Sequence, residues 1–171
     1  MTDLFWDEHH GGLFTSGGDA ESLITRPKDV VDGALPSANS TAAVALVRLS
    51  ALVGEDEYRR RAEDIVRLLG RPLHDHPTAF CHLLAAVDLL AGPLTEVAVV
   101  GHRPDLVAAV QRRYLPQAVL AWGEPYPSPL FANRADGLAY VCREFVCRAP
   151  VDDVGGLRRE LTEFERPQST S

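Results

Sequence analysis

The sequence predicts a mainly helical protein that ends in a small α/β lobe. Between about residues 41 and 91, apolar side chains recur at helical spacing. From Thr95 onward the apolar runs become short and rich in β-branched residues, which is typical of strands. A helical stretch between two of these runs indicates a βαβ unit with a parallel pair of strands. We therefore expect a helical region over 1–94 and an α/β lobe over 95–171.

The first part of the chain is expected to be irregular up to residue 37, with Gly11-Gly12 and Gly17-Gly18 as breaks. The segment 26–40 is polar and rich in turn formers, and it leads straight into an almost wholly apolar stretch at 41–53. A helix with hardly any polar face is expected deep inside a larger structure. The polar segment before it is expected to lie at the mouth of a cavity.

Three helices are expected before the lobe. The first runs to about Val53 and ends at Gly54. The second covers 55–69 and ends before Gly70 and Pro72, since both residues disfavour helix. Its exposed side carries oppositely charged pairs at i,i+4 spacing. The candidate caps of the first helix are Ser37, Asn39 and Ser40, and the third helix begins near Pro77 or Thr78 and runs to Ala91.

The lobe is expected to contain four strands and two helices. Strands are predicted at 96–101, 118–122, 138–142 and 145–147, the last two as a hairpin. Helices are predicted at 104–114, with Pro104 in its first turn, and at 151–164. The tail from Pro167 is expected to fray.

Composition excludes several classes of protein. The net charge of −7 argues against a nucleic-acid partner, which would favour a basic face. No run approaches the roughly 20 apolar residues that span a bilayer, so no membrane partner is expected. The cysteines, Cys81, Cys142 and Cys147, show neither a disulfide framework nor metal-ligand spacing. Cys142 and Cys147 are five residues apart, so on a straight strand they would face opposite ways, although a hairpin could bring them close. They are expected to be a free, partly buried pair in a reducing cytoplasm, with no metal and no cofactor.

Several blocks along the chain carry a family resemblance. They are Phe5-Trp6-Asp7-Glu8 with Gly11-Gly12-Leu13-Phe14, the segment from Arg26 to Ser40, Glu96-Val97-Ala98-Val99-Val100-Gly101, and Tyr140-Val141-Cys142 followed by Cys147, Pro150 and Val151. With these blocks the chain resembles the C-terminal section of the YyaL type, also called the spermatogenesis-associated thioredoxin-like proteins. Ala38 stands where that family usually has glycine.

The resemblance implies a larger architecture. Proteins of this family begin with a thioredoxin-like domain that carries a Cys-x-x-Cys motif. An (α/α)6 toroid follows, similar to N-acylglucosamine 2-epimerases and six-hairpin glycosidases, and a small α/β segment ends the chain. This sequence has no Cys-x-x-Cys motif. Its three expected helices would form about one and a half hairpins, which amounts to a partial toroid whose ring cannot close within the chain.

Eight residues are candidates for binding a sugar-like molecule. Asp29 or Asp32, together with Asp7, could supply two carboxyl groups roughly 5–10 Å apart, as glycoside chemistry needs. That requires the 26–40 loop to pack beside the N-terminal segment 5–14 and to make a shared cavity. The alternative is that these carboxylates cap helices and pair with basic neighbours. The candidates are Trp6, Asp7, Arg26, Lys28, Asp29, Asp32, Ser37 and Asn39.

Three further motifs have ordinary structural explanations. His9-His10 could include a base for proton abstraction, but adjacent residues on an extended stretch point apart, so at most one is expected to face a site. The tract His74-Asp75-His76 has no further near ligand, which favours a solvated linker over a metal site. The stretch from Gly101 to Asp105 opens a helix after a strand, yet it lacks a glycine-rich nucleotide fingerprint.

The expected function is that of a carbohydrate-binding or carbohydrate-metabolism scaffold without turnover of its own. The alternative is a non-catalytic subunit or remnant that associates with a chain carrying the rest of the toroid and the thioredoxin-like domain. The expected partners are a sugar-like small molecule, and a partner chain or second copy docked on the apolar face of the helix at 41–53.

Overall fold

The computed structural model describes residues 2–21 and 25–165 of the chain. The chain divides into two compact units. The first comprises Met1–Ser50 and Glu55–Gly92, and the second comprises Ala51–Gly54 and Pro93–Ser171. The boundary thus falls close to residue 94, and the end of the first long helix belongs with the second unit. The predicted fraying of the tail from Pro167 lies outside the described residues.

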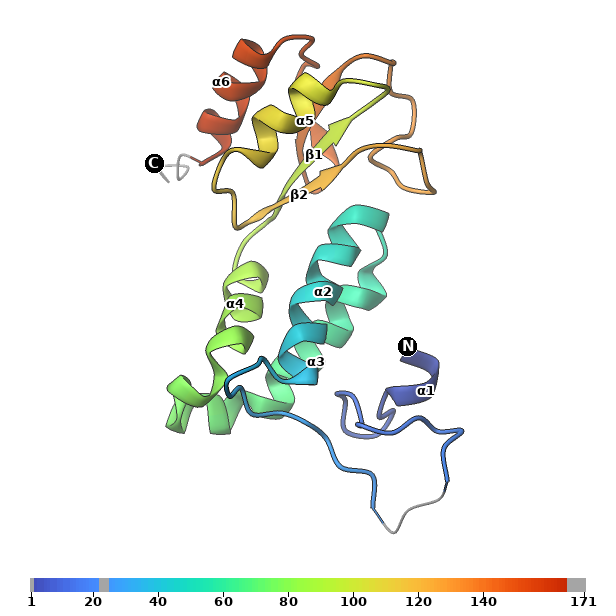
Figure 1. Ribbon diagram of the computed structural model, residues 1–171, viewed down its shortest axis with the longest axis vertical. Coiled ribbons are helices and arrows are strands. Elements are labelled where there is room, and N and C mark those ends of the chain that lie inside the picture. Colours follow the sequence, from blue (N-terminus) through green and yellow to red (C-terminus); the bar gives the residue numbers. More distant parts are fainter. Residues whose placement is uncertain (1, 22–24, 166–171) are drawn as a thin grey trace. The chain divides into compact units, whose positions relative to one another are not determined.

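Helices make up the regular structure of the first unit, and no strand occurs among its described residues between 38 and 91 (Figure 1). The prediction of a helical region there is confirmed. One short helix forms where only irregular structure was expected. The elements are α1 Thr2–Phe5, α2 Ala38–Val53, α3 Asp56–Asp75, the 3-10 helix η1 Pro77–Phe80 and α4 Cys81–Leu90.

Helix α2 begins at a serine cap and ends at a left-handed glycine. The Ser40 amide donates to Ser37 Oγ at 3.1 Å, which makes Ser37 the N-cap among the three candidates. Gly54 has φ +77°, a conformation that favours glycine and ends the helix as predicted. One side of α2 is buried through residues such as Leu46, while Leu49 on the other side is 37% exposed.

Helix α3 continues through Gly70 and Pro72, so the prediction that it ends before them was wrong. A proline removes one backbone donor and crowds the carbonyl four residues earlier. Pro72 lies in the last turn, where few bonds remain to be lost. The His76 amide then closes the helix by donating to the Pro72 carbonyl at 2.9 Å.

The second unit is built on a four-stranded sheet with the order β2-β1-β3-β4. Strands β1 and β2 are parallel, and α5 lies between them in sequence, which confirms the predicted βαβ unit. Strand β3 pairs antiparallel with both β1 and β4, as the predicted hairpin requires. The elements are β1 Thr95–Val99, α5 Pro104–Gln111, β2 Ala118–Ala121, β3 Ala139–Arg143, β4 Val146–Cys147 and α6 Val154–Glu165.

The two faces of this sheet are covered by different elements. On one face, Val97 and Val141 pack against Leu106 of α5 and Leu157 of α6. The other face, which includes Tyr140 and Cys142, packs against the loop between β2 and β3 through residues such as Leu130. Alternation along each strand sends successive side chains to opposite faces, which produces the two clusters.

Cys142 and Cys147 are joined by a disulfide, so the expectation of a free pair was wrong. Five residues apart on one straight strand they would face opposite ways. In the hairpin they are register partners, and directly opposed residues of an antiparallel pair share one face. The turn between the strands is only Glu144 and Phe145, with φ 51° and 61°. Cys81 is a free, exposed thiol.

Candidate functional site

A tight turn from Asp7 to Gly12 shapes the N-terminal part of the first unit. The Gly11 amide donates to the Asp7 carbonyl, and the Asp7 amide donates to the Gly12 carbonyl, both at 2.9 Å. Asp7 Oδ1 accepts the amides of His9 and His10 at 2.9 and 3.2 Å. Gly12 has φ +79°, and an added Cβ would lie 3.0 Å from Asn39 Oδ1. Glycine is therefore required where the turn meets the helices.

Asp7 and Lys28 form a buried ion pair beneath this turn. Lys28 Nζ lies 2.8 Å from Asp7 Oδ2, and the two side chains are 16% and 8% exposed. The ammonium also donates to the Gly11 carbonyl and lies 5.1 Å from the centroid of the Phe14 ring. The hydrogen bond from Lys28 holds the pKa of Asp7 well below its usual range, despite burial. Asp7 is thus a fixed anion, which suits a scaffold better than a general acid.

Asn39 joins the 26–40 loop to the N-terminal segment. Its side chain is fully buried. Asn39 Oδ1 accepts the Leu13 amide at 2.7 Å, and Nδ2 donates to the carbonyls of Leu13 and Asp29 at 2.9 and 2.7 Å. The prediction that this loop packs beside residues 5–14 is therefore confirmed.

Asp29 and Asp32 cap helices. Asp29 Oδ2 accepts the amide of Ala38, the first residue of α2, at 2.9 Å. Asp32 Oδ1 accepts the Ser37 amide at 2.8 Å, while Oδ2 accepts the amide of His82 at 2.7 Å at the start of α4. Burial alone would raise the pKa of Asp32, but these hydrogen bonds outweigh it and leave the pKa below its usual value.

Arg26 completes the set of scaffold contacts. Its Nη2 donates to the carbonyls of Leu4 and Ser16 at 3.1 and 2.6 Å, and its guanidinium lies 4.2 Å from the Phe14 ring centroid. Seven of the eight candidate residues therefore form capping, pairing or bridging contacts inside the unit. They are Asp7, Arg26, Lys28, Asp29, Asp32, Ser37 and Asn39. These contacts match the structural alternative for the carboxylates.

A hollow of about 360 Å³ lies between the N-terminal turn and α3. Its volume falls within the roughly 300–1,000 Å³ of small-molecule sites. Trp6 and Asp7 line it, but none of the other six candidates does, so the 26–40 loop does not form this hollow as expected. The full lining is Trp6, Asp7, Glu8, His9, His10, Gly11, Asp64, Arg67 and Leu68.

Both histidines line the hollow, which corrects the expectation that at most one faces a site. That expectation assumed an extended stretch, whereas the residues lie in a turn, with ring centroids 6.4 Å apart. Sequence reasoning also missed Asp64 and Arg67. Their i,i+3 spacing on α3 was a usable signal, but it resembles an ordinary solvated ion pair, which they also form. The Arg61 guanidinium lies 5.2 Å from the Trp6 ring centroid.

The other motifs do not form sites among the described residues. Arg103 pairs with Asp105 at 2.7 Å and donates to the Asp152 carbonyl, so the start of α5 offers no uncommitted guanidinium. His74 and Asp75 are exposed and end α3, whereas a linker was expected there. No cluster of three metal-ligating side chains occurs within 2–21 and 25–165. Nor does any helix in those ranges have the length and apolar composition to cross a membrane.

Comparison with known proteins finds longer proteins that are similar in sequence to this chain. No family model matches it. Human spermatogenesis-associated protein 20 is 29% identical over 92% of this chain, and the rat and mouse proteins of the same name are 27% and 26% identical over the same share. The chain spans only 22% of the length of each of these relatives. It is homologous to spermatogenesis-associated protein 20 and is consistent with a C-terminal section of that family.

Proposed function

We propose that this chain is a non-catalytic binding section of a protein of the spermatogenesis-associated protein 20 type. Its hollow beside Trp6 takes a sugar-like, polyhydroxylated small molecule. The observation that supports this proposal is a contrast between two groups of polar side chains, those held in contacts within the scaffold and those exposed in the lining of the hollow. Asp7, Asp29 and Asp32 are committed to scaffold contacts. Among the exposed polar residues of the lining, Glu8 and His9 remain turned toward solvent, whereas His10 Nδ1 lies 3.4 Å from Asp7 Oδ2 and Arg67 pairs with Asp64.

The lining suits hydroxyl groups. A carboxylate such as that of Glu8 accepts hydrogen bonds, and imidazole side chains carry two ring nitrogens that form hydrogen bonds. The half-buried indole of Trp6 offers an apolar surface for the C–H face of a sugar ring. Turnover would need a carboxylic acid and a carboxylate placed on either side of the scissile bond. Asp7, the buried carboxylate of the lining, stays ionised beside Lys28 and so does not supply that acid.

The wider scaffold in this proposal is a partial (α/α)6 toroid in a cytoplasmic protein. The succession of α2, α3 and α4, with short connections at Gly54-Glu55 and near His76, supports it as a run of helical hairpins. The remainder of the ring would come from sequence that the relatives possess and this chain does not align with, because the match spans 22% of their length.

Tryptophan fluorescence provides the test, because the chain contains only Trp6 and Trp122. In a Trp122→Phe variant, methyl glucoside or N-acetylglucosamine should change the emission of Trp6 in a saturable way. The matched Trp6→Phe variant, which reports through Trp122 alone, should show no change. Substituting Glu8→Gln or His9→Ala should weaken binding by about fivefold or more, equivalent to roughly one lost hydrogen bond. His102→Ala, at an exposed histidine of the second unit, should leave it unchanged.

Two results would contradict the proposal. If neither sugar changes the emission of Trp6, sugars are excluded as the ligand class. If the purified chain converts either sugar robustly, the section is catalytic and the proposal is wrong. Proton NMR of the sugar during prolonged incubation measures the second outcome directly.

A second candidate is a subunit that associates with another chain or another copy. Five large apolar side chains of the first unit favour it, because they are exposed to solvent: Leu4 at 43%, Val31 at 55%, Leu35 at 80%, Leu49 at 37% and Leu84 at 39%. Single exposed apolar residues are ordinary, but several on one small unit suggest contact with something outside it.

A further inference from the structure

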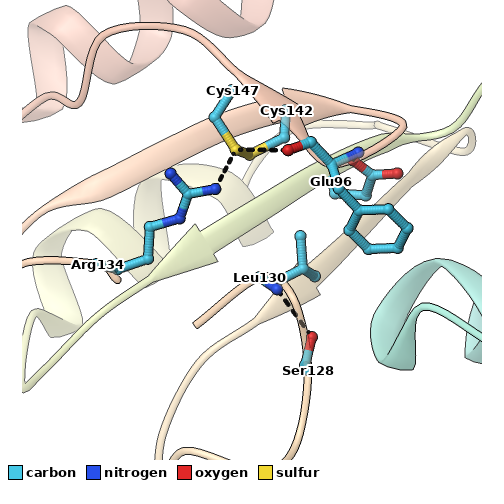
Figure 2. The surroundings of a disulfide bond; sticks show 7 residues. Glu96, Ser128, Leu130, Arg134, Cys142 and Cys147 are labelled. Carbon is cyan, nitrogen blue, oxygen red and sulfur yellow. Dashed lines mark hydrogen bonds between the residues drawn. A yellow bond between two sulfur atoms is a disulfide. The ribbon is translucent and has the colours of Figure 1, made fainter. Parts of the chain in front are cut away.

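The hairpin of β3 and β4 holds a disulfide whose two cysteines differ in their exposure to solvent. Cys142 on β3 is fully buried, whereas Cys147 on β4 is only partly buried. A reagent from solvent therefore reaches Cys147 more readily. Figure 2 shows the bond with Arg134 on one side and Glu96 close by.

Arg134 places a cation against the more accessible sulfur. Its Nη2 lies 2.8 Å from Cys147 Sγ, and its guanidinium lies 4.7 Å from the Tyr140 ring centroid, which helps to fix its position. Among the described residues it forms no ion pair with a carboxylate, and its buried Nε has no hydrogen-bond partner. A neighbouring cation stabilises a thiolate relative to a thiol. Arg134 is therefore placed to stabilise Cys147 in its thiolate form.

Glu96 lies beside the buried sulfur. It is the register partner of Cys142 on β1, so both side chains are on the same face of the sheet, and it is 3% exposed. Its carboxyl accepts the Phe145 amide at 3.0 Å. Burial raises the pKa of Glu96 in spite of this bond, so this carboxyl keeps its proton to a higher pH than an exposed glutamate does.

A purely stabilising role fits this disulfide poorly. The entropy that a disulfide removes from the unfolded chain grows with the loop it closes. Here the cysteines are five residues apart, so the loop is short. Backbone hydrogen bonds of the hairpin and the contact between Phe145 and Glu96 already define the turn.

We propose that Cys142 and Cys147 form a reversible dithiol–disulfide centre that exchanges electrons with dithiol reductants. A thiolate of the reductant attacks Cys147 Sγ and forms a mixed disulfide, while the Cys142–Cys147 bond breaks. Cys142 leaves as a thiolate and takes a proton from Glu96. The second thiolate of the reductant then attacks its own sulfur in the mixed disulfide. Cys147 departs as a thiolate beside Arg134, the reductant becomes a cyclic disulfide, and Glu96 regains a proton from water.

Redox titration of the full chain tests the centre. A Cys81→Ser background removes the free, exposed thiol, so only the pair responds. The protein is equilibrated with mixtures of reduced and oxidised dithiothreitol, and its thiols are counted by maleimide mass shift. We expect one reversible two-electron transition while circular dichroism shows a folded chain. A bond that resists reduction until the chain unfolds would overturn the proposal.

Single-cysteine variants test the assigned roles. In the Cys81→Ser background, Cys142→Ser leaves Cys147 alone, and Cys147→Ser leaves Cys142 alone. With an aromatic disulfide reagent at neutral pH, Cys147 should react at least about tenfold faster, as expected for an accessible thiol beside a cation. Equal rates, or a faster Cys142, would contradict the assignment.

Two positioning residues complete the test. Arg134→Met should slow the reaction of lone Cys147 by about fivefold, whereas Arg112→Met, at an exposed site, should not. Glu96→Gln keeps an acceptor for the Phe145 amide but removes the acid, so reduction of the intact disulfide should slow several-fold at neutral pH. If both substitutions left these rates unchanged, the assigned roles of the guanidinium and the carboxyl would be wrong.

Discussion

Asp7 and Lys28 give the sharpest residue-level prediction, because each is the charge partner of the other in a buried setting. Lys28→Met leaves the Asp7 carboxylate buried without its cation and should cost about 3 kcal/mol of unfolding free energy. Asp7→Asn retains an acceptor for the amides of His9 and His10 and should cost less. Urea unfolding at neutral pH measures both variants. Glu8→Gln, at an exposed neighbour, is the control. If Lys28→Met lowers the unfolding free energy no more than Glu8→Gln does, the ion pair does not stabilise the fold.

The same pair sets a dependence on pH. Folding lowers the pKa of Asp7 below its unfolded value of about 3.9. The stabilisation is therefore fully present above that value and is lost as the pH falls toward the folded pKa. Stability should decline from about pH 5 downward, and the decline should be shallower in Asp7→Asn. Lys28 is the only lysine, so amine labelling should spare it in the folded protein and reach it more readily in Asp7→Asn.

Asn39 offers a second residue-level prediction. Asn39→Ala leaves the buried amide and carbonyl of Leu13 without partners and should cost about 3 kcal/mol. Ser50→Ala on the same helix removes only a hydroxyl bond to the Val47 carbonyl and should cost much less. Amide hydrogen exchange at Leu13 should quicken in the first variant only. Unchanged protection there would show that other contacts hold the N-terminal segment.

The kinds of residue in the 26–40 segment could be interpreted from sequence, but their partners could not. Asp, Ser and Asn before an apolar run predict caps. Which amides they cap depends on the tertiary fold, since Asp32 reaches His82 from 50 positions away. The same limit applies to the hollow, because its second wall comes from α3, far from the turn in sequence.

At the scale of elements, Asp32 links the N-terminal loop to the start of α4. Asp32→Ala should cost about 1–2 kcal/mol and speed amide exchange at His82 and Leu83. Asp29→Ala should instead affect the first turn of α2, where Ala38 loses its acceptor. The two exchange patterns act as controls for each other. An identical pattern in both variants would mean that the loop unfolds as a whole and that the caps do not act separately.

Element boundaries were predictable where a residue has one strong preference, and less so where tertiary contacts decide. Gly54 ends α2 as predicted because a left-handed conformation favours glycine. Pro72 did not end α3, because its cost is small in a last turn. The disulfide was missed because a spacing of five residues says nothing of pairing until the two-residue turn is known.

At the scale of the whole molecule, α2 offers a matched pair of substitutions for the question of association. Leu46 is 3% exposed and Leu49 is 37% exposed on the same helix. Leu46→Glu places a charge in the core and should unfold the first unit. Leu49→Glu and Leu84→Glu should leave it folded and lower any association measured by sedimentation velocity. If the chain is a monomer at all concentrations and neither exposed substitution has an effect, the proposal that it is an associating subunit is wrong.

The proposed role of the hollow beside Trp6 is to bind a polyhydroxylated small molecule without transforming it. Backbone amide NMR of the labelled chain, titrated with N-acetylglucosamine, measures this binding residue by residue. We expect saturable shifts confined to the turn from Trp6 to Gly11 and to the α3 residues Asp64, Arg67 and Leu68, with the sugar recovered intact. Shifts that are absent, that fall in the second unit, or that accompany conversion of the sugar would rule out this role for the hollow.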